Sequence, residues 1–135
     1  MRIVVDSYAW IEIFLGSKKG QSAFLEIQDA ELVVTPEMAL AEIARKYLRE
    51  GAREQIIRSR LQTISESSEL SHIDEATAIG SGKAYLELQV KAKKENIDTP
   101  SLFDGIVLAT ARLNKAKVLT GDPHFRGLPE TIWLE

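Results

Sequence analysis

The segment Arg2-Ile3-Val4-Val5-Asp6-Ser7 decides the fold that this sequence predicts. Its apolar and β-branched residues favour a strand that is buried on both faces of a parallel sheet. The segment then ends on a carboxylate and a hydroxyl. Because open α/β sheets bind ligands just beyond the carboxyl ends of their strands, we expect Asp6 to lie where a functional site would form.

The chain continues with strands and helices in alternation. We expect strands over 31–34, 117–120 and 131–134, with a weak one within 67–73, and helices over 8–15, 18–29, 36–50, 52–66, 75–95 and 100–113. This alternation predicts a parallel sheet with right-handed crossovers, and hence a three-layer α/β/α sandwich with a short, mostly parallel central sheet. A chain of 135 residues is expected to form one domain, 1–135.

The expected helix starts depend on capping residues. A side-chain oxygen just before a helix can accept a backbone N–H of the first turn. The expected caps are Ser7, Thr35, Asp74 and Thr99. Pro36 and Pro100 follow two of them, and proline suits the first helical position because that position needs no N–H donor.

The composition excludes several classes of site. The chain has no cysteine, so it has neither disulfides nor a thiolate metal site, and two histidines do not suffice for a histidine-rich zinc site. No apolar run approaches the roughly 20 residues needed to cross a bilayer. No signal peptide is visible before the first strand, so we expect a cytoplasmic protein with no membrane contact.

The net charge of −3 hides an uneven distribution of charged residues. If four carboxylates share one metal site, the remaining surface carries 16 acids against 17 bases. The bases cluster in two helical stretches, at Arg45, Lys46, Arg49, Arg53, Arg58 and Arg60 and at Lys91, Lys93 and Lys94. Such clusters can bind a nucleic-acid backbone, or they can simply form a solvated helix face.

Two further aspartates are candidates for the site that Asp6 would begin. Asp104 starts an almost wholly apolar helical segment, and a carboxylate buried there needs a partner, either a metal ion or nearby backbone amides. Asp122 follows the strand expected at 117–120, but the Thr-Gly-Asp-Pro sequence at 120–123 is also typical of a turn in which Asp122 caps a helix. Asp6 itself could be a simple turn residue.

Glu42, Ser7 and Thr120 have simpler explanations when each is taken alone. Glu42 lies off the apolar stripe of its helix, as a solvated glutamate would. Ser7 and Thr120 can be a helix cap and a strand end. Either hydroxyl could also bind a carboxylate or a metal-bound water.

Other catalytic motifs are incomplete. The segment Gly80-Ser81-Gly82-Lys83 has the wrong glycine spacing for a phosphate-binding loop, and Ala84 stands where that loop needs Ser or Thr. A phosphatase of the haloacid dehalogenase type would need an aspartate in place of Tyr8. Neither histidine has a serine or cysteine nucleophile elbow around it, which disfavours a hydrolase triad.

Four short motifs, taken in order along the chain, resemble those of the PIN domain family, specifically the VapC-type toxin ribonucleases of bacteria and archaea. They are Val-Val-Asp-Ser at 4–7 followed by an apolar helix, Ala-Glu-Ile-Ala at 41–44, Leu-Phe-Asp-Gly-Ile-Val-Leu-Ala-Thr-Ala at 102–111, and Val-Leu-Thr-Gly-Asp-Pro-His-Phe at 118–125. The resemblance covers the whole chain. Gly105 departs from the pattern, since a small residue such as alanine is commoner there, without affecting the expected site.

The resemblance implies a metal-dependent endoribonuclease of PIN-like fold. Its acidic site would comprise Asp6, Glu42, Asp104 and Asp122 as catalytic and metal-binding residues, with Ser7 and Thr120 in support. These oxygen ligands suit Mg²⁺ or Mn²⁺, as one ion or as two.

The resemblance also implies partners. They are an RNA substrate, a small antitoxin protein of a type II toxin–antitoxin pair, and a second copy of the chain in a homodimer, for which Tyr47 and Leu48 are candidate contacts. Two alternatives stay open. One is an RNA-processing PIN nuclease without an antitoxin, and the other is a catalytically silent PIN-fold interaction module, which four intact acids disfavour.

Overall fold

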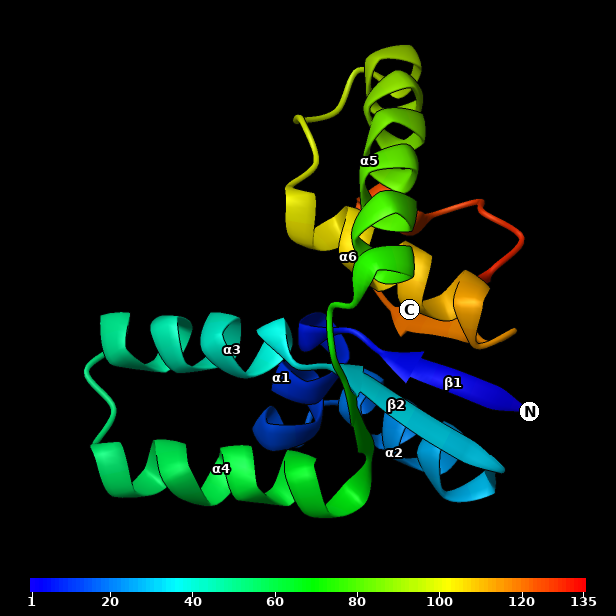
Figure 1. The fold of residues 1–135 in the computed structure, drawn as a ribbon. Coiled ribbons are helices and arrows are strands. Elements are labelled where there is room, and N and C mark those ends of the chain that lie inside the picture. Colours follow the sequence, from blue (N-terminus) through cyan, green and yellow to red (C-terminus); the bar gives the residue numbers. More distant parts are fainter.

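The computed structural model describes residues 1–135 and contains a five-stranded sheet in the order β3-β2-β1-β4-β5, in which every neighbouring pair is parallel (Figure 1). The strands are β1 (Arg2–Val5), β2 (Leu32–Pro36), β3 (Glu69–Ser71), β4 (Lys117–Thr120) and β5 (Thr131–Trp133). Six α-helices surround the sheet: α1 (Ser7–Leu15), α2 (Lys18–Asp29), α3 (Met38–Arg49), α4 (Glu54–Ser67), α5 (Glu75–Glu95) and α6 (Leu102–Leu113). A 3₁₀ turn (Pro123–Phe125) follows β4.

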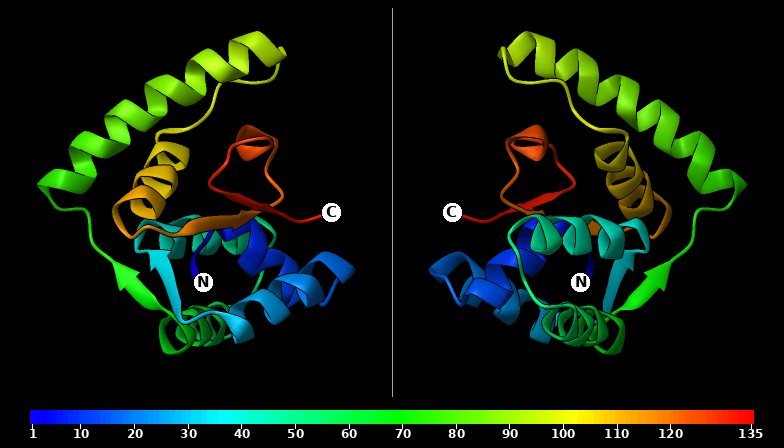
Figure 2. Two further views of the ribbon diagram at one scale, coloured as in Figure 1. Left: turned by 90° about the vertical axis from the view of Figure 1, so that its right-hand side faces the viewer. Right: turned by 90° about the vertical axis from the view of Figure 1, so that its left-hand side faces the viewer.

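Helices cover both faces of the sheet (Figure 2), which confirms the predicted three-layer α/β/α arrangement. Successive residues of β1 point to opposite faces, so each face has its own core. Val4 packs among residues of α5 and α6, whereas Ile3 and Val5 pack among residues of α1, α2, α3 and α4. All three side chains are at most 1% exposed, as the apolar run of β1 predicted.

The start of α3 differs from the prediction. Thr35 and Pro36 belong to β2, where they pair with Leu70 and Ser71 of β3, and they do not begin a helix. The Thr35 hydroxyl is buried and accepts the indole N–H of Trp10 at 3.1 Å. Pairing with β3 thus overrides the local capping preference, and α3 begins at Met38 without a side-chain cap.

Two other helix starts are shifted. Asp6, and not Ser7, is the N-cap of α1, because its side chain accepts the N–H of Ser7. Ser101, and not Thr99, caps α6, which begins at Leu102. The expected caps at Asp74 for α5 and at Asp122 for the 3₁₀ turn are confirmed.

The helices form two arms that meet near the carboxyl ends of β1 and β2 (Figure 1). The α3–α4 pair extends along one direction and the packed α5–α6 pair extends along another. None of these helices combines the length and the apolar character needed to cross a membrane. The two arms carry Glu42 on α3 and Asp104 on α6, and Asp6 and Asp122 follow β1 and β4.

Candidate functional site

Asp6 lies at the end of β1 and is only 3% exposed. Its Oδ1 accepts the backbone N–H of Ser7 at 2.8 Å, and its Oδ2 accepts the hydroxyl of Thr120 at 2.8 Å. Burial raises the pKa of Asp6 from its ordinary 3.8 to about 7, the Thr120 hydrogen bond opposes this, and the charges of Asp122 and Asp104 add to it. A buried carboxyl group therefore faces two other acids.

Thr120 connects two of these acids. Its side chain is fully buried, and its Oγ1 donates to Asp6 while accepting the backbone N–H of Asp122 at 3.0 Å. Gly121 stands between them because a Cβ there would lie 2.5 Å from a ring carbon of Tyr8. The turn after β4 therefore positions Asp122 beside Asp6. Ser7 supports the site only through its backbone N–H, which it donates to Asp6, because its hydroxyl makes no hydrogen bond.

Asp104 comes from the first turn of α6 and is 7% exposed. Its Oδ2 accepts the N–H of Ser101 at 2.9 Å, and its own N–H is accepted by the Ser101 hydroxyl at 3.2 Å, which forms a capping box. Asp104 therefore bonds a nearby backbone amide, which is the structural role that its position in the sequence also allowed. It uses only one carboxylate oxygen, since Oδ1 makes no hydrogen bond, and burial still raises the pKa of Asp104.

Glu42 reaches the same group from α3. It is half-buried and makes neither a hydrogen bond nor an ion pair. Burial is the main cause that raises the pKa of Glu42, the charges of Asp104 and Asp122 raise it further, and Arg45 lowers it. The packing of α3 thus directs toward the other acids a glutamate that periodicity alone assigned to solvent.

His124 is a member of this group that the sequence analysis did not select. Its Nδ1 lies 2.8 Å from Asp122 Oδ1 and its Nε2 lies 2.7 Å from the backbone oxygen of Asp98. Both partners accept, so only the protonated ring satisfies both contacts. Burial lowers the pKa of His124, but these two hydrogen bonds and the charges of Asp122 and Asp104 outweigh it and raise the pKa.

The donor set can be tested against a divalent cation. One ligand atom from each of Asp104, Asp122 and His124 lies within 4.8 Å of the others. The two ring nitrogens of His124 already have partners, whereas Oδ1 of Asp104, Oδ2 of Asp122 and both oxygens of Glu42 have none. Free carboxylate oxygens beside a buried Asp6 fit a hard cation such as Mg²⁺ or Mn²⁺.

The structure therefore brings the predicted acids together at one edge of the sheet, with Thr120 between two of them. His124 could have been suspected from the Asp-Pro-His sequence at a strand end. Its second partner, the carbonyl of Asp98, lies 26 residues earlier in the loop before α6, and no sequence pattern indicates that contact.

Comparison with known proteins gives consistent matches. The family model of the PIN domain matches residues 3–130. No curated protein matches the sequence. A solved toxin–antitoxin complex from Klebsiella pneumoniae contains a similar chain, with a TM-score of 0.67 and 20% identity over 96% of this chain and 95% of that chain.

Two further solved structures have the same fold. Mycobacterium tuberculosis VapC20, described as a toxin that cleaves the sarcin–ricin loop, has a TM-score of 0.68 and 18% identity over 95% of each chain. Rickettsia felis VapBC2, bound to a DNA fragment from its promoter, has a TM-score of 0.66 and 15% identity over 98% of this chain and 97% of that chain. At these identities the likeness shows the shared fold.

Proposed function

Because the chain belongs to the PIN domain family, we propose that it is a metal-dependent endoribonuclease and the toxin of a type II toxin–antitoxin pair. The observation that carries this proposal is the convergence of Asp6, Asp104 and Asp122, with Glu42 facing them, at the carboxyl edge of the sheet. Burial and mutual repulsion raise the pKa values of Asp6, Glu42 and Asp104, which costs stability unless a cation balances the charges.

The residues would have distinct roles in this proposal. Asp6 and Asp104 would hold the cation directly, and Glu42 and Asp122 would complete its surroundings directly or through water. Bound there, Mg²⁺ or Mn²⁺ would act as a Lewis acid toward the phosphodiester and make a coordinated water more acidic. Thr120 orients Asp6 through its hydroxyl, and His124 orients Asp122.

One unpaired arginine of α3 supports RNA as the substrate. Lys46 and Arg58 are paired with glutamates one turn away, at Glu50 and Glu54. Arg45, by contrast, forms no ion pair and is exposed. An unpaired guanidinium one turn from Glu42 can bind a phosphate of the RNA backbone.

The decisive experiment compares wild type with Asp6→Asn on single-stranded RNA in Mg²⁺, in Mn²⁺ and in a chelator. We expect cleavage by wild type only with metal, and loss of cleavage in the variant. Sequencing of RNA ends after induction of both proteins in cells would identify the substrate. Undiminished cleavage by dialysed wild type in the chelator would rule out the metal-dependent reaction.

The solved toxin–antitoxin complexes of the same fold support an antitoxin partner. We propose that it inhibits by placing a basic side chain, arginine by preference, among the acids, because guanidinium matches carboxylates in geometry and charge. Asp104→Asn should then bind the antitoxin more weakly than wild type does. Unchanged affinity in a titration would argue against insertion into this site.

A homodimer also belongs to the proposal, with different contacts from those expected. The prediction that Tyr47 contacts the second copy is wrong, because Tyr47 is only 6% exposed. Its ring packs under Arg60, whose guanidinium carbon lies 4.7 Å from the ring centre. Leu48 remains available at 62% exposure, and α5 adds an exposed apolar stripe at Ile79, Leu86 and Val90. Light scattering of Leu48→Glu and Leu86→Glu would identify the interface, and a monomeric wild type would contradict the dimer.

A further inference from the structure

One face of α3 carries a small hollow directly beside the acidic site. Its volume is about 180 Å³, and it is lined by Met38, Ala41, Glu42 and Arg45. These residues recur at the i, i+3, i+4 and i+7 spacing of one helix face. Glu42 belongs both to this hollow and to the acidic group, so the hollow begins where the site ends.

Arg45 supplies the positive charge of the hollow. It lies one turn after Glu42 and influences that residue's ionisation, yet it comes within 4.0 Å of no carboxylate. Other basic residues of the same helix pair behave differently, since Lys46 and Arg58 form i,i+4 ion pairs with Glu50 and Glu54. The Arg45 guanidinium is therefore free to bind an anion that approaches the acidic site.

Met38 and Ala41 supply an apolar surface beside that charge. Both are exposed, and the Met38 side chain is 38% exposed. A hollow of about 180 Å³ can receive one flat ring system but not a folded nucleic-acid element. A flexible thioether makes favourable contacts with an aromatic ring.

We infer that this hollow binds one nucleotide of single-stranded RNA next to the phosphate that is cut, with its base against Met38 and Ala41 and its phosphate on Arg45. This inference rests on the proposed nuclease function and names the substrate class of the same site. The strand must be single because a base can lie flat on the protein only when it is unstacked from its neighbours. A basic peptide segment fits less well, since Arg45 would repel it.

The first test separates binding from catalysis. Arg45→Ala should raise KM for a short single-stranded RNA by about tenfold to a hundredfold, the range expected for one charge-assisted hydrogen bond, with kcat nearly unchanged. Arg45→Lys should recover part of this loss, because lysine keeps the charge without the planar fork. The Arg45 side chain is exposed, so both variants should fold, and thermal melts check that they do.

The second test concerns the base. Met38→Ala should raise KM by about twofold to tenfold through the lost contact between the thioether and the base, and it should change which nucleotide flanks the cut in RNA-end sequencing. An RNA that lacks the base at that position should bind wild type and Met38→Ala equally. These affinities are measured by fluorescence anisotropy in an Asp6→Asn background, so that the RNA stays intact.

Two control variants make the result specific. Arg49→Ala removes the same charge one turn further along α3, outside the hollow, and should leave the cleavage profile unchanged. Lys117→Ala, at the opposite end of the sheet, should leave KM and kcat unchanged. If Arg45→Ala affects KM no more than Arg49→Ala does, general electrostatics explains the basic face and the inference is wrong.

The remaining outcomes distinguish this inference from the function on which it depends. Cleavage by wild type with unaltered KM and profile in the Arg45 and Met38 variants would overturn the inference alone. Loss of antitoxin affinity in Met38→Ala without loss of RNA affinity would identify the hollow as a protein contact and would also overturn it. If no RNA is cleaved with any metal, the proposed function fails, and equal anisotropy of wild type and Arg45→Ala would reject the nucleotide site as well.

Discussion

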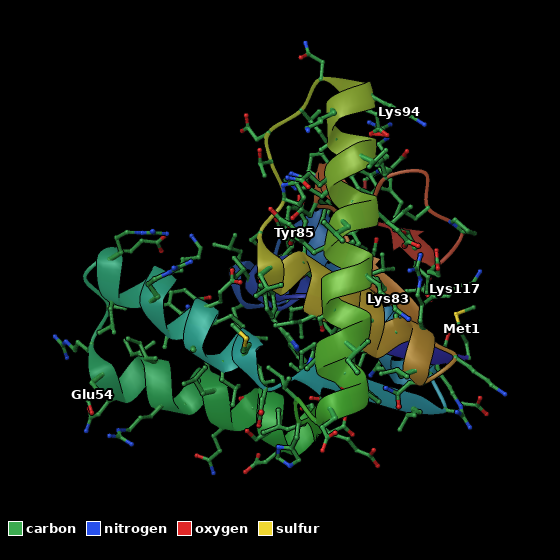
Figure 3. The ribbon with its side chains drawn as sticks, turned by 45° about the horizontal axis from the view of Figure 1, so that its top comes forward. Met1, Glu54, Lys83, Tyr85, Lys94 and Lys117 are labelled. Carbon is green, nitrogen blue, oxygen red and sulfur yellow. The ribbon has the colours of Figure 1, made fainter.

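The two ends of the parallel sheet carry charged residues in opposite ways. At the amino end, a hollow of about 430 Å³ is lined by Met1, Arg2, Glu31, Leu113, Lys115 and Lys117. Its charges are mixed and exposed, and Met1 and Lys117 lie together on that side of the molecule (Figure 3). At the carboxyl end, Asp6 and Asp104 are 3% and 7% exposed and have the same sign.

The difference teaches where to look for function. At the amino end, Glu31 lies 4.0 Å from the terminal ammonium and 3.9 Å from Arg2. These groups, and the unpaired Lys115 and Lys117, are exposed, so water and salt screen their charges. At the carboxyl end, burial and repulsion oppose ionisation of Asp6, Asp104 and Glu42. The exposed charges of the larger hollow therefore have little effect on stability, whereas the buried acids destabilise the fold until a counter-charge balances them.

The largest expected effect is on activity at the carboxyl end. Asp104→Asn should reduce metal-dependent RNA cleavage by about a thousandfold, because loss of several kcal/mol of transition-state stabilisation corresponds to about that factor. Asparagine keeps an oxygen that can accept the N–H of Ser101, so α6 should remain capped. Lys117→Ala is the matched change at the amino end, and equal loss of activity in both variants would abolish the distinction between the two ends.

The next effect is on stability without metal. Asp6→Asn removes one charge from the acidic group while keeping the shape of the side chain. In a chelator near pH 8, the variant should be more stable than wild type by roughly 1–4 kcal/mol, because wild type must ionise a buried carboxyl group. Millimolar Mg²⁺ or Mn²⁺ should stabilise wild type by mass action and the variant less.

The pH dependence of this stability has a defined sign. The pKa of Asp6 is raised to about 7 in the folded protein, against an ordinary 3.8. Between these values the folded state holds a proton that the unfolded chain releases, so the contribution of Asp6 to stability increases as the pH falls through about 7 and levels off near 3.8. The stability difference between variant and wild type should shrink over the same range in thermal melts. A variant that melts below wild type at pH 8 would indicate a purely structural Asp6.

Much of this arrangement follows from local sequence. The β1 run is apolar enough to be buried on both faces, and the aspartates at 6, 104 and 122 come directly after a strand or at a helix start. What could not be predicted depends on contacts between distant segments. Thr35 continues β2 because β3 pairs with it, and Glu42 joins the acids because α3 packs where it does.

A middle-sized effect is expected where α5 and α6 pack at the carboxyl end. A Cβ at Gly105 would lie 2.6 Å from the backbone oxygen of Ser81 and 3.0 Å from Cβ of Tyr85, whose side chain points from α5 toward the start of α6 (Figure 3). This close approach of α5 to α6 requires glycine at position 105. Gly105→Ala should destabilise the protein by about 1–3 kcal/mol through overpacking, which chemical denaturation measures. Gly82→Ala is the control, since a Cβ there meets nothing within 4 Å.

The smallest effect is expected at the amino end. It tests whether the charges there contribute as little to stability as their exposure indicates. Glu31→Gln removes the carboxylate that approaches both Arg2 and the terminal ammonium of Met1. The side chains of Arg2 and Met1 are 48% and 52% exposed. Exposed pairs at 3.9 and 4.0 Å are screened by water and salt, so the free energy of unfolding should change by less than about 0.5 kcal/mol. Raising the salt concentration should change the free energy of unfolding of wild type and of Glu31→Gln by the same amount. In Asp6→Asn, by contrast, salt should narrow the difference from wild type, because screening weakens repulsion among the acids. A loss above about 1 kcal/mol in Glu31→Gln, beyond the usual range of exposed ion pairs, would mean that the amino end holds a coupled charge network, and the contrast between the two ends would then be one of degree.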